Sequence, residues 1–288
     1  MGAVMNIDNS FMRNGFLRWR RSIAAASIFC LLAACGAHPA KSESTDYQGP
    51  RQERALEMWR ARCQQSGEFI HRVVDGVDGV FLVNVRTALN LADQYELNDP
   101  YGRDLTDEGY IQTFLRGSYG YERKVPPPEG WPDYKGYSFV EAVDAKDGRL
   151  YRYTGRVEEP WQNDKSYLKG YLRFVVDKAP IASRTARYGI RFDDISTQQE
   201  RDNWIAGSSL KVVDLKDGSV IAERVGYMVD WAQGSKAGGR SPWLFAADNA
   251  CPDFDRDFPK STWTLTHKNR NQPRQTQRFV EKVLRAQP

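Results

Sequence analysis

The chain has few of the residues that carry most enzyme chemistry. Its 288 residues include three histidines and four cysteines. A zinc site needs several histidine, cysteine or carboxylate ligands at close spacing, and His38, His71 and His267 are widely separated. No established reaction motif is recognisable either. We therefore predict no catalytic residue, no metal and no cofactor.

A long apolar run is also missing. The apolar stretch 22–32 has eleven residues, whereas a membrane-spanning helix needs about 20. Arg18, Arg20 and Arg21 come before it, and small residues follow it. A positive segment, a short apolar segment and a small-residue end form the pattern of a cleavable secretory signal. The sequence therefore predicts export rather than a transmembrane anchor.

The end of this segment, Leu32-Ala33-Ala34-Cys35, resembles the lipobox of bacterial lipoproteins. The resemblance implies cleavage before Cys35, a diacylglycerol on its sulfur and a fatty acid such as palmitate on its new amine. Three acyl chains together give stable anchoring. In this family an aspartate after the cysteine retains the protein in the inner membrane. Gly36 stands there, which implies the periplasmic face of the outer membrane; an ordinary secreted protein is the alternative.

The net charge of +4 comes mostly from the signal segment. Residues 1–34 hold four arginines and one aspartate, so 37 basic and 36 acidic residues remain after cleavage. A nucleic-acid-binding surface is typically a basic stripe with interleaved aromatics, and the sequence has none. We therefore expect no nucleic-acid partner, and contact with the membrane only through the lipid anchor.

Two cysteines remain once Cys30 leaves with the signal and Cys35 is lipidated. These are Cys63 and Cys251, near the two ends of the mature chain. Two thiols in an oxidising compartment predict one disulfide bond. Two separately buried thiols are the alternative. A bond between them would enclose most of the chain in one closed unit.

The sequence predicts three parts. Residues 1–34 are the signal peptide, residues 35–50 are the lipidated cysteine with a polar tether, and residues 51–288 are a single periplasmic domain. The domain is predicted to be α+β, with an antiparallel β-sheet core between an N-terminal helix and a C-terminal helix.

Apolar spacing and turn residues predict the elements of this domain. Apolar residues at helical spacing predict a helix over 51–66 and a closing helix over 275–286. Two runs around Asp75-Gly76 predict a hairpin of strands 68–74 and 79–86. The remaining strands are expected at 137–145, 150–157, 168–177, 187–195, 208–215 and 220–230.

Two of these hairpins share a phrase. Val143-Asp144-Ala145-Lys146-Asp147-Gly148 and Val213-Asp214-Leu215-Lys216-Asp217-Gly218 each place Asp-Gly between β-rich runs, which is a strong hairpin signal. Two independent hairpins explain this, and a duplicated half-domain is the alternative. Residues 204–214 and 222–227 also resemble uncharacterised proteobacterial lipoproteins, which implies no activity.

The densest polar cluster of the β region consists of Asp193, Asp194, Glu200 and Arg201. Paired carboxylates can divide acid and base roles in glycoside cleavage. Adjacent residues of a strand point to opposite faces, however, so Asp193 and Asp194 cannot face one substrate together. A salt-bridged connection that fixes Trp204 in the core is the preferred interpretation.

Two weaker patterns complete the search for chemistry. Gly207-Ser208-Ser209 begins like a nucleophile elbow, but the closing glycine is absent and a strand is predicted to follow. Asp253, Asp255 and Asp257 alternate as in a calcium loop, without its glycine or terminal glutamate. We interpret the first as a turn entering a strand and the second as an acidic surface loop.

The sequence therefore predicts an outer-membrane lipoprotein with a non-catalytic domain. Its role is expected to be that of a binding, immunity-type or envelope-assembly accessory protein with a periplasmic protein partner. Eight tryptophans, more than a single core needs, favour an interface. The alternatives are an envelope hydrolase that acts on peptidoglycan, glycan or lipid through carboxylates, and a purely structural spacer.

Overall fold

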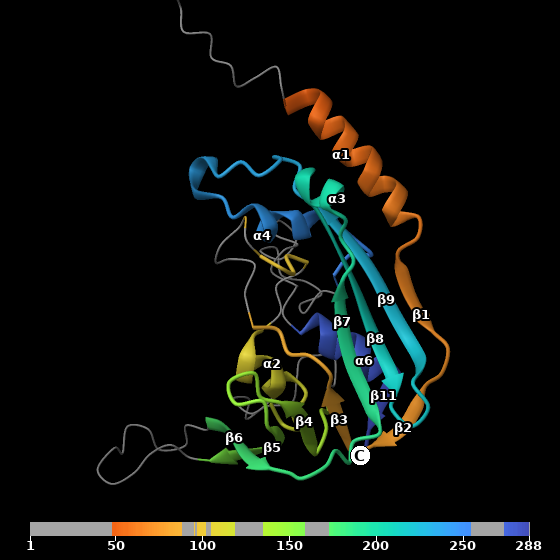
Figure 1. Cartoon of the computed structure of the whole chain (residues 1–288), viewed down its shortest axis with the longest axis vertical. Helices are drawn as coiled ribbons and strands as arrows, with labels where there is room; N and C mark the ends of the chain where they lie inside the picture. The colour runs from red at the N-terminus through yellow and green to blue at the C-terminus, as the bar shows by residue number, and fades with distance from the viewer. Residues whose placement is uncertain are drawn as a thin grey trace, which may run out of the picture. The chain divides into compact units, whose positions relative to one another are not determined.

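The fold is given by a computed structural model (Figure 1). The structure describes residues 48–87, 95, 97–101, 105–118, 135–158, 173–254 and 274–287. The signal segment, Cys35 and Gly36 lie outside these residues. No helix within the described part of the chain is long and apolar enough to cross a membrane.

The first helix, α1, spans Gln48–Cys63, so it begins and ends earlier than the predicted range 51–66. It ends where the Ser66 hydroxyl donates to the Cys63 carbonyl over 2.9 Å. Its apolar side packs on one end of the sheet. The contact joins Ala55, Leu56, Met58 and Trp59 to Ile205, Tyr227 and Val229.

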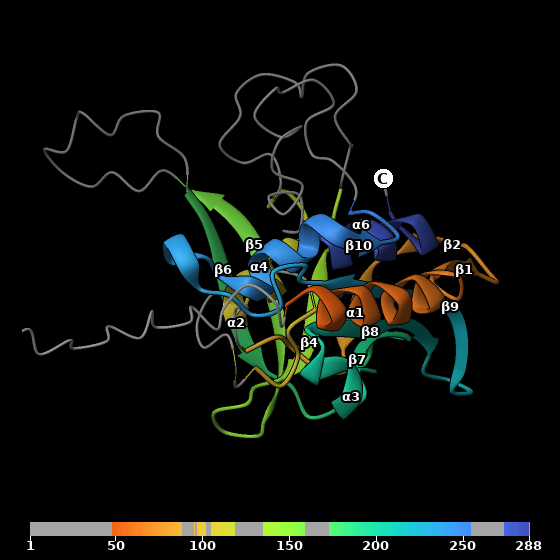
Figure 2. The same cartoon turned by 90° about the horizontal axis from the view of Figure 1, so that it is seen from above.

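The main sheet has nine strands, and its order along the hydrogen-bonded path is β1-β9-β8-β7-β3-β4-β5-β6, with β10 also paired to β9. Figure 2 shows β1 and β9 at one side of this sheet and β5 and β6 at the other. The strands are β1 Gly67–Ile70, β3 Gly79–Leu82, β4 Phe139–Val143, β5 Leu150–Glu158, β6 Arg173–Pro180, β7 Tyr188–Asp194, β8 Ile205–Asp214, β9 Ser219–Val229 and β10 Ala250–Cys251.

Four further helices are described, together with two short 3₁₀ turns. Figure 1 shows α6 behind β7 and β8, and buried residues of α6 share one core cluster with these strands. The elements are α2 Asp107–Thr113, α3 Gln198–Asp202, η2 Ala237–Gly239, α4 Pro242–Ala246, η3 Ala247–Asn249 and α6 Gln275–Val283.

The predicted closing helix is shorter than expected. Its apolar face of Phe279, Val280, Val283 and Leu284 is buried, as predicted. The chain leaves the helix after Val283, however, and continues as strand β11, Leu284–Ala286. β11 pairs in parallel with β2, Val74–Val77. The prediction of a helix to residue 286 was wrong because the last residues gain backbone partners in this second sheet.

The predicted hairpin of strands 68–74 and 79–86 is absent. β1 pairs with β9 instead, and β3 lies between β4 and β7. The Asp75-Gly76 pair, expected to form the turn, lies inside β2. The apolar side chains of β3 are buried among long-range neighbours, with Val80 fully covered and Leu82 nearly so. Their burial in the centre of the sheet overrides the local turn signal.

The sheet is mixed, not purely antiparallel. β3 runs parallel to both β4 and β7, whereas the other pairs of the main sheet are antiparallel. A parallel neighbour needs a long crossover, and the segment between β3 and β4 supplies one that carries α2. The α+β class is therefore correct, and the antiparallel core was wrong for the central three strands.

The two hairpins with the shared phrase are both present. β4 pairs with β5, and β8 pairs with β9. In each turn the glycine N–H, of Gly148 or Gly218, donates over 2.8 Å to the carbonyl of Asp144 or Asp214. The two turns are not equivalent in the sheet, because β4 adjoins β3 whereas β8 is separated from it by β7. This arrangement favours independent hairpins over a duplicated half-domain.

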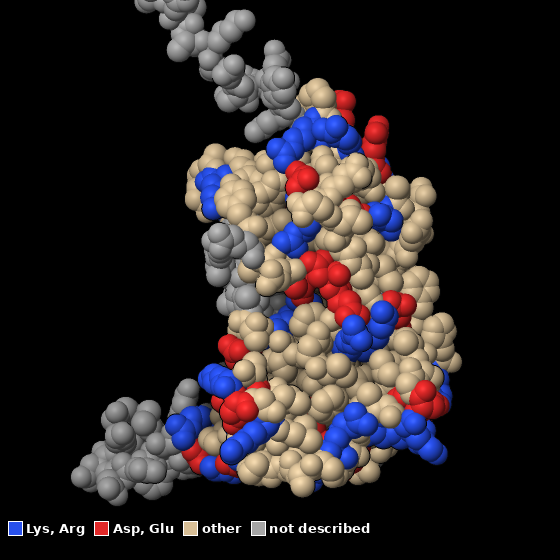
Figure 3. Space-filling view, viewed as in Figure 1, with Lys and Arg blue, Asp and Glu red and all other residues tan. Residues whose placement is uncertain are grey.

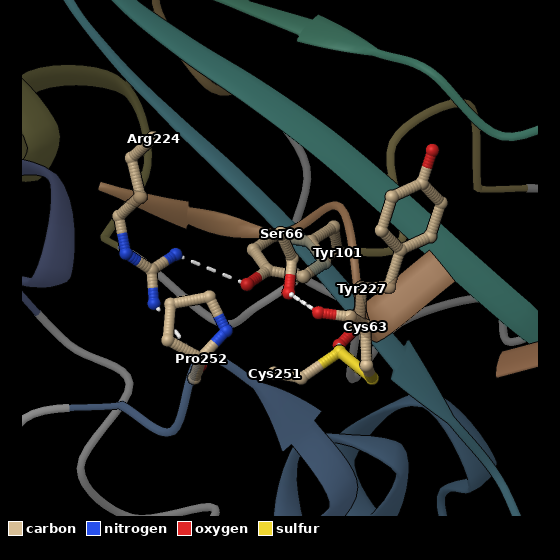
Figure 4. Close-up of a disulfide and its surroundings, with 7 residues drawn as sticks. All are labelled: Cys63, Ser66, Tyr101, Arg224, Tyr227, Cys251 and Pro252. Atoms are coloured by element: carbon tan, nitrogen blue, oxygen red, sulfur yellow. Dashed lines mark hydrogen bonds between the residues drawn. A yellow bond between two sulfur atoms is a disulfide. The ribbon is translucent and has the colours of Figure 1, made fainter. Parts of the chain in front are cut away.

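The predicted disulfide is present (Figure 4). Cys63 and Cys251 are bonded with their Cα atoms 5.5 Å apart, within the range predicted for a bridge. The bond joins the end of α1 to β10 across 188 residues of sequence. Beside it, buried Arg224 donates to the Tyr101 hydroxyl over 3.0 Å and to the Pro252 carbonyl over 3.2 Å. The two Arg224 contacts attach the segments of Tyr101 and Pro252 to β9.

Candidate functional site

The two adjacent aspartates of β7 face opposite sides of the sheet, as alternation requires. Asp193 lies 2.8 Å from Arg191 and 3.5 Å from Lys211. Asp194 pairs with Arg201 over 3.0 Å and accepts from the Ser196 N–H over 2.8 Å. Figure 3 shows acidic and basic side chains side by side on the displayed face. Both aspartates therefore have cationic partners.

Glu200 is buried and serves the start of α3. It accepts from the Thr197 backbone N–H, while the Thr197 hydroxyl accepts from the Glu200 N–H. Its other partner is Arg62 of α1, at 2.5 Å. This reciprocal pair is a capping box, and the ion pair attaches α3 to α1. The partners of Glu200 thus hold α3 in place, and neither of them is a partner of Asp193.

Arg201 is the one member of the predicted cluster that borders an aromatic site. It donates to the carbonyls of Leu97 and Asn98, and its guanidinium lies 5.7 Å from the centre of the Trp243 ring. These contacts attach α3 to Leu97 and Asn98, and the Asp194 pair attaches it to β7. The structure therefore brings Arg201 and Asp194 together but gives Asp193 and Glu200 other partners.

Arg201 lines a surface cleft of about 550 Å³, which we call the aromatic cleft. The Trp204 and Trp243 ring centres lie 4.7 Å apart, and the Tyr95 ring meets Trp204 edge-on at 5.2 Å. Tyr95 is 59% exposed, whereas both tryptophans are largely buried. The lining residues are Arg51, Tyr95, Gln198, Arg201, Asp202, Trp204 and Trp243.

The backbone around Trp204 has an unusual conformation. Trp204 has a φ of +55°, which bulky residues rarely adopt and which costs about 1–3 kcal/mol. Its N–H donates to the Arg201 carbonyl, and its carbonyl accepts from the Asp230 N–H over 2.9 Å. Gly234 lies against its ring, where a Cβ atom would come within 2.2 Å. The surrounding contacts thus hold the tryptophan in one arrangement.

A buried carboxylate organises the loop that covers Trp204. Asp230 accepts from the Gly234 N–H over 2.9 Å and pairs with Arg240 over 2.6 Å. The same loop places Lys236 4.1 Å from the centre of the Tyr95 ring. The aromatic cleft therefore has a pre-organised wall rather than a collection of loose side chains.

The sequence predicted Trp204 as a core residue but did not indicate Tyr95 or Trp243 as its neighbours. The three aromatics come from the segment before α2, the turn before β8 and helix α4. No periodicity joins them, because their contact depends on long-range pairing. The aromatic excess of the chain was the one signal that pointed to such a site.

The weaker candidates are the two serines of the elbow-like sequence, the histidines and the alternating aspartates. Ser208 and Ser209 lie buried in β8, and the Ser209 hydroxyl donates to Glu223 over 2.5 Å. His71 is exposed next to β1, and His267 lies outside the described residues. Asp253 is described, whereas Asp255 and Asp257 are not. The described residues contain no group of three or more metal-ligating side chains.

Two described carboxylates have raised pKa values. Burial raises the pKa of Asp99, and its partner Arg86 opposes the shift. Burial also raises the pKa of Glu281 in α6 to about 6, against hydrogen bonds from Gln277 and from two backbone N–H groups. Neither residue lines the aromatic cleft. They therefore do not form a pair of catalytic carboxylates there.

The raised pKa of Glu281 predicts a pH-dependent stability. A carboxyl with a folded pKa of about 6 and an ordinary value of 4.5 stabilises the fold fully below pH 4.5, and this contribution is lost as the pH rises through 6. The ionised form costs on the order of 1–2 kcal/mol at pH 7. We expect Glu281→Gln to remove this cost, because an amide oxygen still accepts the backbone hydrogen bonds.

Urea unfolding at pH 4.5 and pH 7.5 measures this effect. The variant should gain about 1–2 kcal/mol over the natural protein at pH 7.5 and little at pH 4.5. Glu57→Gln, the same substitution at an exposed position of α1, is the control and should change the free energy of unfolding equally little at both pH values. If the free energy of unfolding of the Glu281 variant depended on pH as strongly as that of the natural protein, this would contradict the raised pKa of Glu281.

Comparison with known proteins adds no relative: no family model, no curated protein and no solved structure matches this chain.

Proposed function

We propose that the protein is an outer-membrane lipoprotein, anchored through Cys35 on the periplasmic face, whose domain binds a protein partner through the aromatic cleft. The lipobox-like Leu32-Ala33-Ala34-Cys35 and the residue Gly36 support the anchor and its location. The disulfide fits an oxidising compartment. The proposed role is binding, without a chemical step.

The aromatic cleft is the observation that carries the binding role. Tryptophan, tyrosine and arginine are the residues most enriched at the energetic centres of protein interfaces. Here Trp204, Trp243, Tyr95 and Arg201 meet at one surface, and hydrogen bonds already hold Arg201 in place. A pre-organised anchor binds at a lower entropic cost than a mobile one.

The arrangement of the carboxylates favours binding over hydrolysis. A glycosidase of the two-carboxylate kind needs an acid and a base that flank one bond. Asp193, Asp194 and Glu200 have cationic partners on different sides of β7 and α3. Asp202 is the single described carboxylate in the aromatic cleft, and it accepts from Gln198 over 2.8 Å.

Site-specific photocrosslinking in living cells tests this proposal. We expect a photoreactive phenylalanine at position 95 to give one discrete adduct with a partner, because Tyr95 is the most exposed aromatic of the cleft. Phe69, which is 44% exposed on β1, is the matched control and should give no such adduct. Tyr95→Ala should weaken partner binding roughly tenfold or more.

The same adduct from both positions would mean that the cleft has no special role. A lack of any adduct at position 95, with normal protein levels and normal fractionation, would reject the cleft as a partner site. The mass of the adduct distinguishes a protein partner from a small ligand.

A further inference from the structure

A second cleft opens at the other half of the sheet. β3 and β4 are parallel, so their carboxyl ends lie at the same edge. After β3 the chain passes through α2, whose first turn lines the cleft, and it leaves β4 at this edge through the turn that contains Lys146. Ligands of open sheets with parallel strands commonly bind outside these carboxyl ends. The cleft measures about 430 Å³, within the usual range of small-molecule sites.

This cleft, which we call the charged cleft, has an apolar floor and charged walls. Ile111, Val143 and Tyr153 contribute apolar surface. Asp107 and Glu108, in the first turn of α2, supply two carboxylates from one element. Lys146 and Lys178 supply two ammonium groups from the β4–β5 turn and from β6. Both signs of charge therefore meet around one apolar surface.

Three of these four charged side chains have no ion-pair partner among the residues that the structure describes. Lys178 pairs with Asp144 and lies 3.7 Å from the centre of the Tyr151 ring. Within the described part of the chain, the side chains of Asp107, Glu108 and Lys146 form no hydrogen bond and no ion pair within 4.0 Å. The carboxylates and Lys146 thus line one cleft without neutralising each other, and a ligand with both charges can satisfy them together.

We propose that the charged cleft binds a small zwitterion of dipeptide size. Its ammonium group contacts Asp107 and Glu108, its carboxylate contacts Lys146, and its apolar part lies on Ile111 and Tyr153. A simple anion would pair only with the lysine, and a simple cation would pair only with the carboxylates. The site shares no residue with the aromatic cleft and does not depend on the proposed partner binding.

The repeated turn of the sheet supplies a matched control. Lys146 and Lys216 occupy the same position in the two shared phrases and are both exposed. The N–H of each donates to the carboxylate of the aspartate two residues earlier, over 2.8 Å for Lys146 and 3.2 Å for Lys216. Only Lys146 lines the charged cleft. Substituting either lysine thus has the same local consequence but a different effect on this site.

Calorimetric titration of the full protein, purified in detergent, tests the proposal with alanyl-alanine as the probe. We expect the free dipeptide to bind, and the N-acetylated and C-amidated forms to bind about tenfold more weakly or worse, since each lacks one charge-assisted contact. Lys146→Glu should weaken binding by a similar factor, and Lys216→Glu should not change it. Asp107→Asn combined with Glu108→Gln should weaken it likewise.

Several results would overturn the proposal. No binding of the free dipeptide, or equal binding of both blocked forms, rejects a zwitterion site. If Lys146→Glu and Lys216→Glu weaken dipeptide binding equally, the weakening does not arise from a contact in the charged cleft. Inorganic phosphate or calcium that binds the cleft, while the dipeptide does not displace it, assigns the site to a simple ion. Far-ultraviolet circular dichroism of each variant verifies that the fold is intact.

Discussion

The Cys35→Ser variant is expected to carry no fatty acid and to leave the membrane fraction or remain unprocessed. Cys35 is the cysteine of the lipobox-like sequence, and a serine hydroxyl cannot form the thioether to diacylglycerol that the lipoprotein resemblance implies. Without the three acyl chains, the protein would have no stable attachment to the membrane. Metabolic labelling with a fatty-acid probe, followed by fractionation of the envelope, measures both effects. Continued labelling of the serine variant would remove the basis for the anchor.

Gly36→Asp is the matched control for this experiment. It leaves the Cys35 thiol in place, so labelling should be unchanged. The lipoprotein resemblance implies that an aspartate at this position moves the protein toward the inner membrane. Density-gradient separation of the two membranes shows the shift. An unchanged distribution would count against the outer-membrane location while leaving the lipid anchor intact.

Loss of the Cys63–Cys251 bond should lower the free energy of unfolding by about 2–5 kcal/mol. The bond encloses the main sheet from β1 to β10 within one loop, so its removal releases a large part of the unfolded chain. Without it, α1 remains attached through its apolar contact with Ile205, Tyr227 and Val229 and through the Arg62–Glu200 pair. We therefore expect a folded but much less stable protein.

Urea unfolding with and without a reducing agent isolates the bond from the side chains. The natural protein should lose stability on reduction, and the double variant Cys63→Ala, Cys251→Ala should be insensitive to it. A difference below about 0.5 kcal/mol on reduction of the natural protein would show that the bond has little influence on stability.

Local signals predicted the two antiparallel hairpins correctly. In β4–β5 and β8–β9 the turn residues and the apolar runs are adjacent in the sequence, and Gly148 and Gly218 accept the positive φ that the turns require. The apolar face of α6 was correct for a similar reason, because helical spacing shows which side is buried. These elements need only short-range information.

The same signal was wrong around Asp75-Gly76. A favourable turn competes there with the burial of β3, whose side chains need neighbours on both sides. Those neighbours, β4 and β7, come from far along the chain. Local spacing contains no information about partners at such separations, so neither the parallel pairs nor the pairing of β2 with β11 was predictable from it.

The candidate sites divide in the same way. The polar cluster of Asp193, Asp194, Glu200 and Arg201 was visible in the sequence, and so was the rule that separates the two aspartates. The aromatic cleft was not visible, because Tyr95, Trp204 and Trp243 meet only after β9 and its following loop are in place. The charged cleft likewise exists only because β3 and β4 end at one edge.

The sequence by itself determined the disulfide partners and the two Asp-Gly hairpins, and it is the basis of the predicted export signal and the predicted lipid attachment at Cys35. These features depend on residue type, residue count or spacing within a few positions. The tertiary structure alone decided which strands are parallel, which charges have partners and which aromatics meet. Those properties depend on the burial of apolar surface between distant segments, and a linear pattern does not record that burial.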